Sequence, residues 1–200
     1  ADRLWVILRN GTTGAGTLWR LAAPGIKTGA QTFTDTGVVA GPSGGTSYYG
    51  DMCYFEDSAG TDYLASMGRD ATARFFHVMS GLGGTPTRLR LTGVTKEPSG
   101  GGTYADGCSI VWDGVPGGYL YAQTTATTRL MRIRIPSDPT VDGGATGWGT
   151  WEAVTGLPAN MGAGSGIAFA TVDRPGSVVT PNYYASGTVT TAVDILPVAG

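Results

Sequence analysis

A pattern that recurs every 55 to 60 residues limits the fold of this chain more than any other feature of its sequence. Each copy contains a short segment that reads apolar, large apolar, basic, aliphatic. The three segments are LWRL at residues 18–21, FFHV at 75–78 and LMRI at 130–133. Similarity at such a period is typical of proteins built from repeated supersecondary units. We therefore expect one structural unit to occur three times.

Other short apolar segments accompany each of these cores. Those that precede the cores are residues 4–8, 63–67 and 119–123, and those that follow lie near 32–36, 88–92 and 150–155. The segments that follow close on Thr36-Gly37-Val38, Thr92-Gly93-Val94 and Thr155-Gly156-Leu157, and a last segment ends each time in Asp57, Asp113 or Asp173. Because the connections are rich in Gly, Asn, Asp and Thr, we expect antiparallel strands joined by tight hairpins.

The composition favours strands and turns over helices. The chain has 34 glycines in 200 residues and only 14% charged residues, whereas soluble domains average about 7% glycine and about 25% charged residues. Glycine destabilises helices and favours tight turns. With 41% hydrophobic and 10% aromatic residues, the chain can nevertheless build a core.

Each unit has apolar side chains on both faces, as Phe75 and Phe76 illustrate. A single four-stranded sheet cannot bury both faces, but sheets stacked radially can, which is the logic of a β-propeller. The third unit carries the clearest motifs, CSIVWDGVPGGYLYAQ, RLMRIRIPSDP, WGTWEAVTGLP and GAGSGIAFATVD. In these motifs the chain resembles kelch-type or galactose-oxidase-like propeller repeats, over residues 4–173. The resemblance implies an all-β, propeller-like fold of about three four-stranded antiparallel blades of 55–60 residues, plus a C-terminal β segment.

The repeat also predicts the domain organisation. We expect a repeat region at 1–173, with units of about 1–57, 58–113 and 114–173, and a C-terminal strand segment at 174–200 that is a closure strand or the start of another domain. If the Asp-ended strand is innermost, residues 1–38 supply three strands, 51–94 four, 108–157 four and 166–173 one. Propellers usually have four to eight blades. The chain is therefore expected to be part of a larger propeller, to complete a ring by oligomerising, or to stack its sheets in an open array.

The single histidine, His77, is the first candidate for chemistry. It falls at the repeat position held by Arg20 and Arg132, so we interpret all three as structural basic positions whose polar tips lie at the edge of an apolar contact. If they instead bind a ligand, they would line equivalent pockets between blades. No Ser nucleophile elbow is expected, because such an elbow leads from a strand into a helix and this sequence favours strands and turns. A Ser-His-Asp arrangement assembled only by the fold is the alternative.

The recurring aspartates are interpreted as turn residues, because Asp after a strand commonly accepts hydrogen bonds from its own backbone. Asp51 and Asp106 are the alternative candidates, for a cation site at the axis of the blades. Cys53 and Cys108 are taken as equivalent buried thiols without the spacing of a metal site. No cofactor or metal is expected.

Aromatic residues beside Gly-rich connections are the main candidates for recognition, since loops on a rigid scaffold commonly bind ligands. Aromatic rings stack on sugars and anchor protein interfaces. The alternative is that they fill gaps between blades. These residues are Tyr48, Tyr49, Tyr104, Trp148, Tyr183 and Tyr184.

We therefore expect a structural or adhesive module rather than an enzyme, since no catalytic constellation stands out. Repeats of this kind resemble those of phage structural and bacterial surface proteins, which implies a virion or extracellular location and partners that are further copies or other structural chains. A net charge of −2 without basic clusters argues against nucleic acid, and no apolar run is long enough for membrane insertion. A carbohydrate-binding propeller and a fragment of a sialidase or galactose-oxidase type enzyme are the alternatives.

Overall fold

The computed structural model is all-β, which confirms the predicted class. It describes residues 4–9, 15–21, 32–40, 48–69, 74–91, 109–123, 130–154, 166–172, 180–186 and 194–197. These residues form fourteen strands and no helix, and hence no helix that could cross a membrane. The strands are β1 Leu4–Arg9, β2 Gly16–Leu21, β3 Phe33–Val39, β4 Tyr48–Glu56, β5 Asp62–Arg69, β6 Arg74–Ser80, β7 Thr87–Leu91, β8 Ser109–Trp112, β9 Tyr119–Gln123, β10 Leu130–Arg134, β11 Glu152–Ala153, β12 Gly166–Val172, β13 Thr180–Ser186 and β14 Asp194–Pro197.

The strands belong to four antiparallel sheets in which neighbours along the chain are also neighbours in the sheet. Sheet A contains β1–β2–β3, sheet B contains β4–β5–β6–β7, sheet C contains β8–β9–β10–β11, and sheet D contains β12–β13–β14. This order follows from the short Gly- and Asp-rich connections, because antiparallel strands can be joined by tight hairpins whereas parallel strands need long crossovers.

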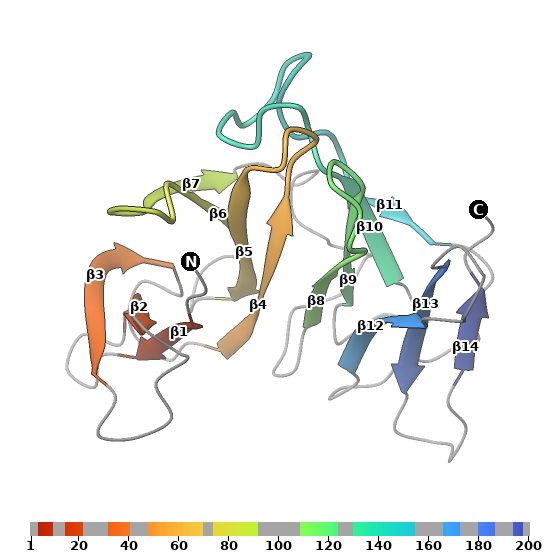
Figure 1. Cartoon of the computed structure of the whole chain (residues 1–200), viewed down its shortest axis with the longest axis horizontal. Helices are drawn as coiled ribbons and strands as arrows, with labels where there is room; N and C mark the ends of the chain where they lie inside the picture. Colours follow the sequence, from red (N-terminus) through yellow and green to blue (C-terminus); the bar gives the residue numbers. More distant parts are fainter. Residues whose placement is uncertain are drawn as a thin grey trace.

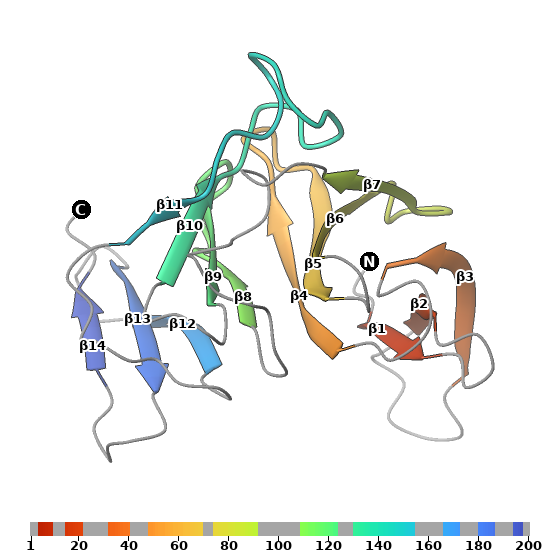
Figure 2. The same cartoon turned by 180° about the vertical axis from the view of Figure 1, so that it is seen from behind.

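The sheets follow one another in chain order, and Figure 1 shows them as an arch with sheet A at one end and sheet D at the other. The first strands of sheets B, C and D lie together, with β4 beside β8 and β8 beside β12. The view from behind in Figure 2 shows the same sequence of sheets. Within the described ranges no sheet closes on itself, and both views show sheets A and D apart at the two ends of an open arch.

Sheets A, B and C contain the three, four and four strands counted from the repeat, whereas sheet D contains three where the repeat predicted one. The difference comes from the segment 174–200, which supplies β13 and β14. Both strands extend the sheet that β12 begins, through the register pairs Phe169 with Tyr183 and Tyr183 with Leu196. The described part of this segment therefore continues the array of sheets.

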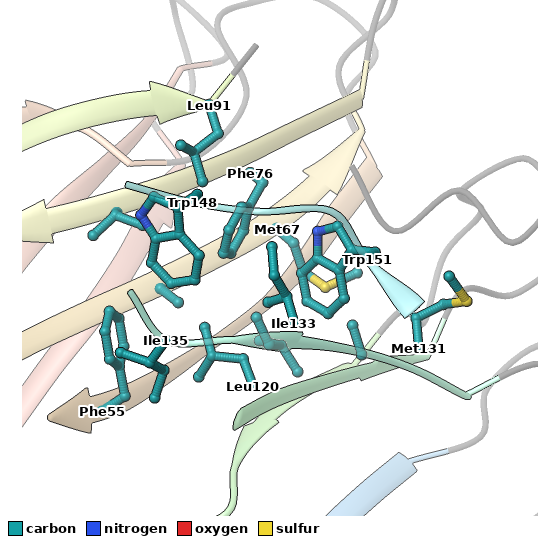
Figure 3. Packing of buried hydrophobic residues seen from close by; sticks show 14 of the residues in the cluster. Phe55, Met67, Phe76, Leu91, Leu120, Met131, Ile133, Ile135, Trp148 and Trp151 are labelled. Atoms are coloured by element: carbon teal, nitrogen blue, oxygen red, sulfur yellow. The ribbon is translucent and has the colours of Figure 1, made fainter. Parts of the chain in front are cut away.

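The largest described core lies between sheets B and C (Figure 3). Phe55 and Phe76 contribute from sheet B, Leu120 and Ile133 contribute from sheet C, and all four are buried. Trp148 enters the same core from the loop between β10 and β11. The contact is thus a packed sheet-on-sheet interface, stabilised by removal of apolar surface from water.

A second core lies between sheets A and B and consists of Leu18, Ala40, Leu64, Met79 and Leu82. Strand β6 therefore has both faces buried, with Phe76 and Val78 toward sheet C and Met79 toward sheet A. This explains why the sequence of β6 lacks the polar alternation of a half-exposed strand. The predicted burial of both faces by stacked sheets is confirmed for sheet B.

Strand β3 does not end at Thr36-Gly37-Val38 as the sequence predicted, but continues to Val39. The tripeptide forms a bulge opposite Leu18, because Thr17 pairs with Val39 and Trp19 with Asp35. Gly37 has φ 72°, which only glycine adopts easily. The corresponding tripeptides at 92–94 and 155–157 lie outside the described residues, and the strand expected at 150–155 is limited to β11.

Candidate functional site

His77 lies in the contact between sheets A and B and is only 2% exposed. Its ring stacks on Phe75 with centroids 4.6 Å apart. Its Nδ1 lies 3.0 Å from the backbone oxygen of Ala40, which also accepts a 2.6 Å hydrogen bond from the Ser66 hydroxyl. The burial of the imidazole favours the structural role predicted from the sequence, because a general base must reach its substrate.

Arg20 approaches the same contact from the opposite side. Its Nη1 donates to the backbone oxygen of Gly84, in the turn between β6 and β7, at 3.0 Å, whereas His77 reaches from β6 to Ala40 beside sheet A. The two residues therefore do not line equivalent pockets, and the predicted equivalence of Arg20 and His77 is wrong. Side chains alternate between the faces of a strand, so aligning Phe75 rather than Phe76 with Leu18 exchanged the two faces.

Arg132 occupies a third environment. It lies on the face of sheet C opposite Met131 and Ile133, which pack against sheet B. Its Nε is 3.3 Å from Glu152 Oε2, and its guanidinium lies over the ring of Tyr119, 4.8 Å from the centroid. Arg20 and His77 thus reach across the contact between sheets A and B from opposite sides, whereas Arg132 lies on the face of sheet C that points away from sheet B.

Asp57 organises the hairpin between β4 and β5. Its Oδ1 accepts hydrogen bonds from the N–H groups of Ala59 and Thr61, both at 2.9 Å, and its Oδ2 accepts one from the Tyr63 hydroxyl at 3.2 Å. Burial works against ionisation, but the hydrogen bonds from Thr61, Ala59 and Tyr63 together hold the pKa of Asp57 below its ordinary value. The predicted role as a turn residue is confirmed.

Asp113 occupies the matching place in the hairpin between β8 and β9. It accepts hydrogen bonds from the N–H groups of Val115 at 3.0 Å and Tyr119 at 2.8 Å. Here burial outweighs the hydrogen bonds and raises the pKa of Asp113. The third aspartate, Asp173, lies outside the described residues.

Asp51 links sheet B to sheet C. Its Oδ2 accepts hydrogen bonds from the Ser109 hydroxyl at 2.9 Å and from the Ile110 N–H at 3.2 Å. This carboxylate is therefore engaged in holding β4 against β8. Asp106 lies outside the described residues, and within them no group of three or more His, Cys, Asp or Glu side chains could hold a metal ion.

Cys53 has a free thiol on the same strand and is partly buried against the core between sheets B and C. Burial, together with the nearby Asp51 carboxylate, raises the pKa of the thiol. A thiol with a raised pKa is a poor nucleophile, which agrees with the interpretation of Cys53 as a structural residue. Cys108 lies outside the described residues.

Trp148 is not an exposed recognition residue, because it is only 1% exposed. Its indole packs edge-to-face on Phe55 and Phe76, with centroids 5.9 and 5.3 Å away, and its Nε1 donates to the backbone oxygen of Pro139 at 3.0 Å. The loop that carries it folds back over sheets B and C (Figure 3). Trp148 thus takes the alternative role of filling a gap between sheets.

Four of the predicted tyrosines lie in strands. Tyr48 and Tyr49 begin β4, and Tyr183 and Tyr184 lie in the middle of β13. Only the backbone of these four residues is described, so their role in recognition stays a prediction. Tyr104 lies outside the described residues.

One pair of aromatics, only one of which is exposed, was missed. Tyr54 on β4 is 41% exposed and packs edge-to-face against the partly buried Trp112 on β8, with centroids 5.6 Å apart. The Tyr54 hydroxyl lies 2.5 Å from Glu56 Oε1 and 2.7 Å from Asp62 Oδ1. Burial and these carboxylates raise the pKa of Tyr54. The signal was present in MCYFED and CSIVWD, which were interpreted only as inner strands.

A polar groove of about 590 Å³ lies under the loop between β10 and β11, where the two hairpins of the aspartates approach it. Its lining includes Ser58, Arg134, Ser137, Thr146 and Glu152. Glu152 is paired with Arg132, as described above. Arg134 is exposed, contacts the Tyr119 ring, and makes no ion pair within the described part of the chain. The groove therefore offers one uncompensated positive charge among hydroxyl groups.

Comparison of the chain with protein-family models, with curated proteins and with solved structures finds no match. The resemblance to kelch-type repeats therefore stays a prediction.

Proposed function

We propose that this protein is a non-catalytic structural or adhesive module whose sheets are arranged as blades of a β-propeller. The juxtaposition of β4, β8 and β12 supports this arrangement, because the first strand of each propeller blade lies nearest the axis. Stacking of sheet A on sheet B and of sheet B on sheet C supplies the cores that single sheets lack.

The observation that carries the proposal is the open arch. Sheet B packs against sheet A on one face and against sheet C on the other. Sheets B and C have four strands each, whereas the end sheets A and D have three strands each. Exposed apolar residues remain on sheet A, at Leu4 and Leu8. Contiguous exposed apolar surface commonly marks an interaction site. Assembly with further copies or other structural chains would cover it.

The proposed function does not include catalysis, because the candidate catalytic side chains are buried or already hydrogen-bonded within the fold. His77 is buried, and Asp57 and Asp113 are occupied by their own hairpins. A virion or extracellular surface location is proposed on the resemblance to phage structural and bacterial surface repeats.

Light scattering of the purified chain over a concentration series tests assembly, and electron microscopy of the native particle would show copy number and neighbours. We expect a concentration-dependent oligomer or a stable complex with partner chains. A chain that stays monomeric at all concentrations and has no partner in its native source would contradict the proposal.

Carbohydrate binding is the second candidate function, and the groove at Arg134 favours it. An uncompensated guanidinium beside Ser and Thr hydroxyls suits a sugar that carries a carboxylate or sulfate. We expect binding to acidic glycans on an array to be lost in Arg134→Met and kept in Arg90→Met, since Arg90 lies on β7 away from the groove. An array without any bound glycan would reject this candidate.

A further inference from the structure

We infer that the groove beside Arg134 takes a sugar acid that carries a single negative charge, and that Glu152 is the residue that discriminates against more highly charged glycans. This inference rests on the carbohydrate-binding candidate proposed above. It adds to that candidate the class of sugar and the side chain that selects it.

The groove has a positive and a negative side chain on one face of sheet C. Arg134 follows Arg132 by two residues on β10, so the two side chains project from the same face of the strand. Glu152 on β11 is in register with Arg132. Arg134 and Glu152 are therefore diagonal neighbours across the two strands, and such neighbours lie roughly 7–8 Å apart. Both of them line the groove.

The balance of these charges suits a ligand with one anionic group. Glu152 Oε2 lies 3.3 Å from Arg132 Nε, so the charges of this pair offset each other. Arg134 lies over the ring of Tyr119, 5.9 Å from the centroid, and makes no ion pair within the described ranges. Its guanidinium can therefore bind one carboxylate of a ligand. A second negative group on the same ligand would lie close to the Glu152 carboxylate.

The rest of the lining suits a hydroxylated ring better than a bare ion. Ser58, Ser137 and Thr146 supply hydroxyl groups, and Pro136 and Ala145 supply apolar surface for the C–H groups of a sugar. The volume of about 590 Å³ lies within the range of pockets for small organic ligands, roughly 300–1,000 Å³. A carboxylate such as that of Glu152 only accepts hydrogen bonds, so it favours hydroxyl groups of the ligand as neighbours.

Repulsion by Glu152 sets the size of the expected selectivity. Two negative charges a few ångströms apart repel each other strongly at the effective dielectric constant of a protein surface. The Glu152 side chain is 60% exposed, so water and salt weaken this repulsion. We therefore expect the groove to prefer the singly charged sugar by about tenfold, without excluding the doubly charged one completely.

The experiment compares two ligands that differ by one charged group. Methyl glucuronide carries one carboxylate, and the same glycoside with an added sulfate ester carries a second negative charge. NMR titration of each ligand into the isotope-labelled protein measures its dissociation constant. We expect the wild type to bind the glucuronide about tenfold more tightly than the sulfated glycoside, and Arg134→Met to bind neither.

Two variants assign the selectivity to Glu152. Glu152→Gln should bind the sulfated glycoside at least as tightly as the glucuronide, because the repelling carboxylate is gone. This change also frees the charge of Arg132, so the double variant Arg132→Gln/Glu152→Gln removes both charges and leaves the net charge beside the groove unchanged. The double variant should keep the relaxed preference. Both positions are exposed, and the loss of an exposed ion pair changes stability little.

Asp35→Asn is the matched control for the removal of a carboxylate. Asp35 is exposed on β3 of sheet A and does not line the groove. The amide oxygen of Asn can still accept the hydrogen bond that Asp35 Oδ1 receives from the Gly37 N–H. This variant should retain the tenfold preference of the wild type.

The outcomes separate this inference from the proposed function. A wild type that binds both glycosides equally, or a double variant that recovers the wild-type preference, would overturn the role of Glu152 and leave carbohydrate binding at Arg134 standing. Unchanged binding in Arg134→Met would place the sugar outside the groove and overturn the inference. A wild type that binds neither glycoside would also overturn it, and an array without any bound glycan would then reject the carbohydrate-binding candidate as well.

Discussion

Truncation of Trp148 is the sharpest test of the packing between sheets B and C. Its indole is buried and contacts Phe55 and Phe76 edge-to-face. Truncating a buried Trp to Ala usually costs about 3–5 kcal/mol, from lost transfer free energy and the cavity left behind. Because domains of this kind are stable by only roughly 5–15 kcal/mol, we expect Trp148→Ala to lose a large part of the free energy of unfolding.

Two variants separate the contributions to this loss. Trp148→Phe keeps an aromatic ring but removes the N–H that donates to Pro139, and should cost roughly 1–2 kcal/mol. Trp112→Ala is the matched control, because Trp112, on β8, is a tryptophan that packs against the same core but is only partly buried. Its truncation should cost less than about 1.5 kcal/mol.

Urea unfolding followed by circular dichroism measures all three free energies. A loss below about 1 kcal/mol in Trp148→Ala, or a loss no larger than that of Trp112→Ala, would refute the assignment of Trp148 to the core. A stable Trp148→Ala variant that loses a ligand would instead restore the interpretation of Trp148 as a recognition residue.

Three further predictions concern the hairpins and the bulge. Asp57→Ala should lose about 1–3 kcal/mol at pH 7, and this deficit should vanish in acid, because the contribution of Asp57 is present above its unfolded pKa of about 3.9 and is lost as the pH falls through its lowered folded pKa. For Asp113 the sign reverses, because its raised pKa makes the free energy of unfolding of the wild type fall as the pH rises from the ordinary Asp pKa to the raised one. Asp113→Asn should abolish that fall. Urea titrations between pH 3 and 7 measure the free energies of unfolding of both variants, and parallel pH profiles for the two would contradict these predictions. Gly37→Ala should lower the free energy of unfolding by about 1–2 kcal/mol, because its φ of 72° is unfavourable for alanine. Gly83→Ala is the control, at another glycine with open space around it, and should leave the melting temperature nearly unchanged. Equal melting temperatures for the two variants would argue against the bulge at Gly37.

The repeat predicted most of the strand order, because each strand and each hairpin depends mainly on a few consecutive residues. The aspartate after the first strand of sheets B and C was correctly interpreted, since its hydrogen-bond partners lie two to six residues away. The assignment of basic positions failed for the opposite reason. Phe75 and Phe76 are equally apolar, so nothing local shows which of them faces sheet A.

The candidate site was less predictable than the strands. The burial of Trp148 depends on the conformation of the loop between β10 and β11. The groove around Arg134 is formed by that loop and by two hairpins that are distant in sequence. The contact between Tyr54 and Trp112 depends on β4 lying beside β8. Each of these features needs the relative position of two sheets.

The amino-acid sequence by itself determined an all-β chain of short antiparallel strands, because glycine-rich turns and repeated apolar segments act over a few residues. Only the tertiary structure decided which face of each strand meets which neighbour. In strands that are apolar on both faces the alternation of polar and apolar residues disappears. The local sequence then no longer indicates which side chains face which neighbouring sheet. The neighbouring sheet supplies that information, which is why the sequence did not indicate that Leu4 and Leu8 of β1 are exposed whereas Leu18 of β2 is buried.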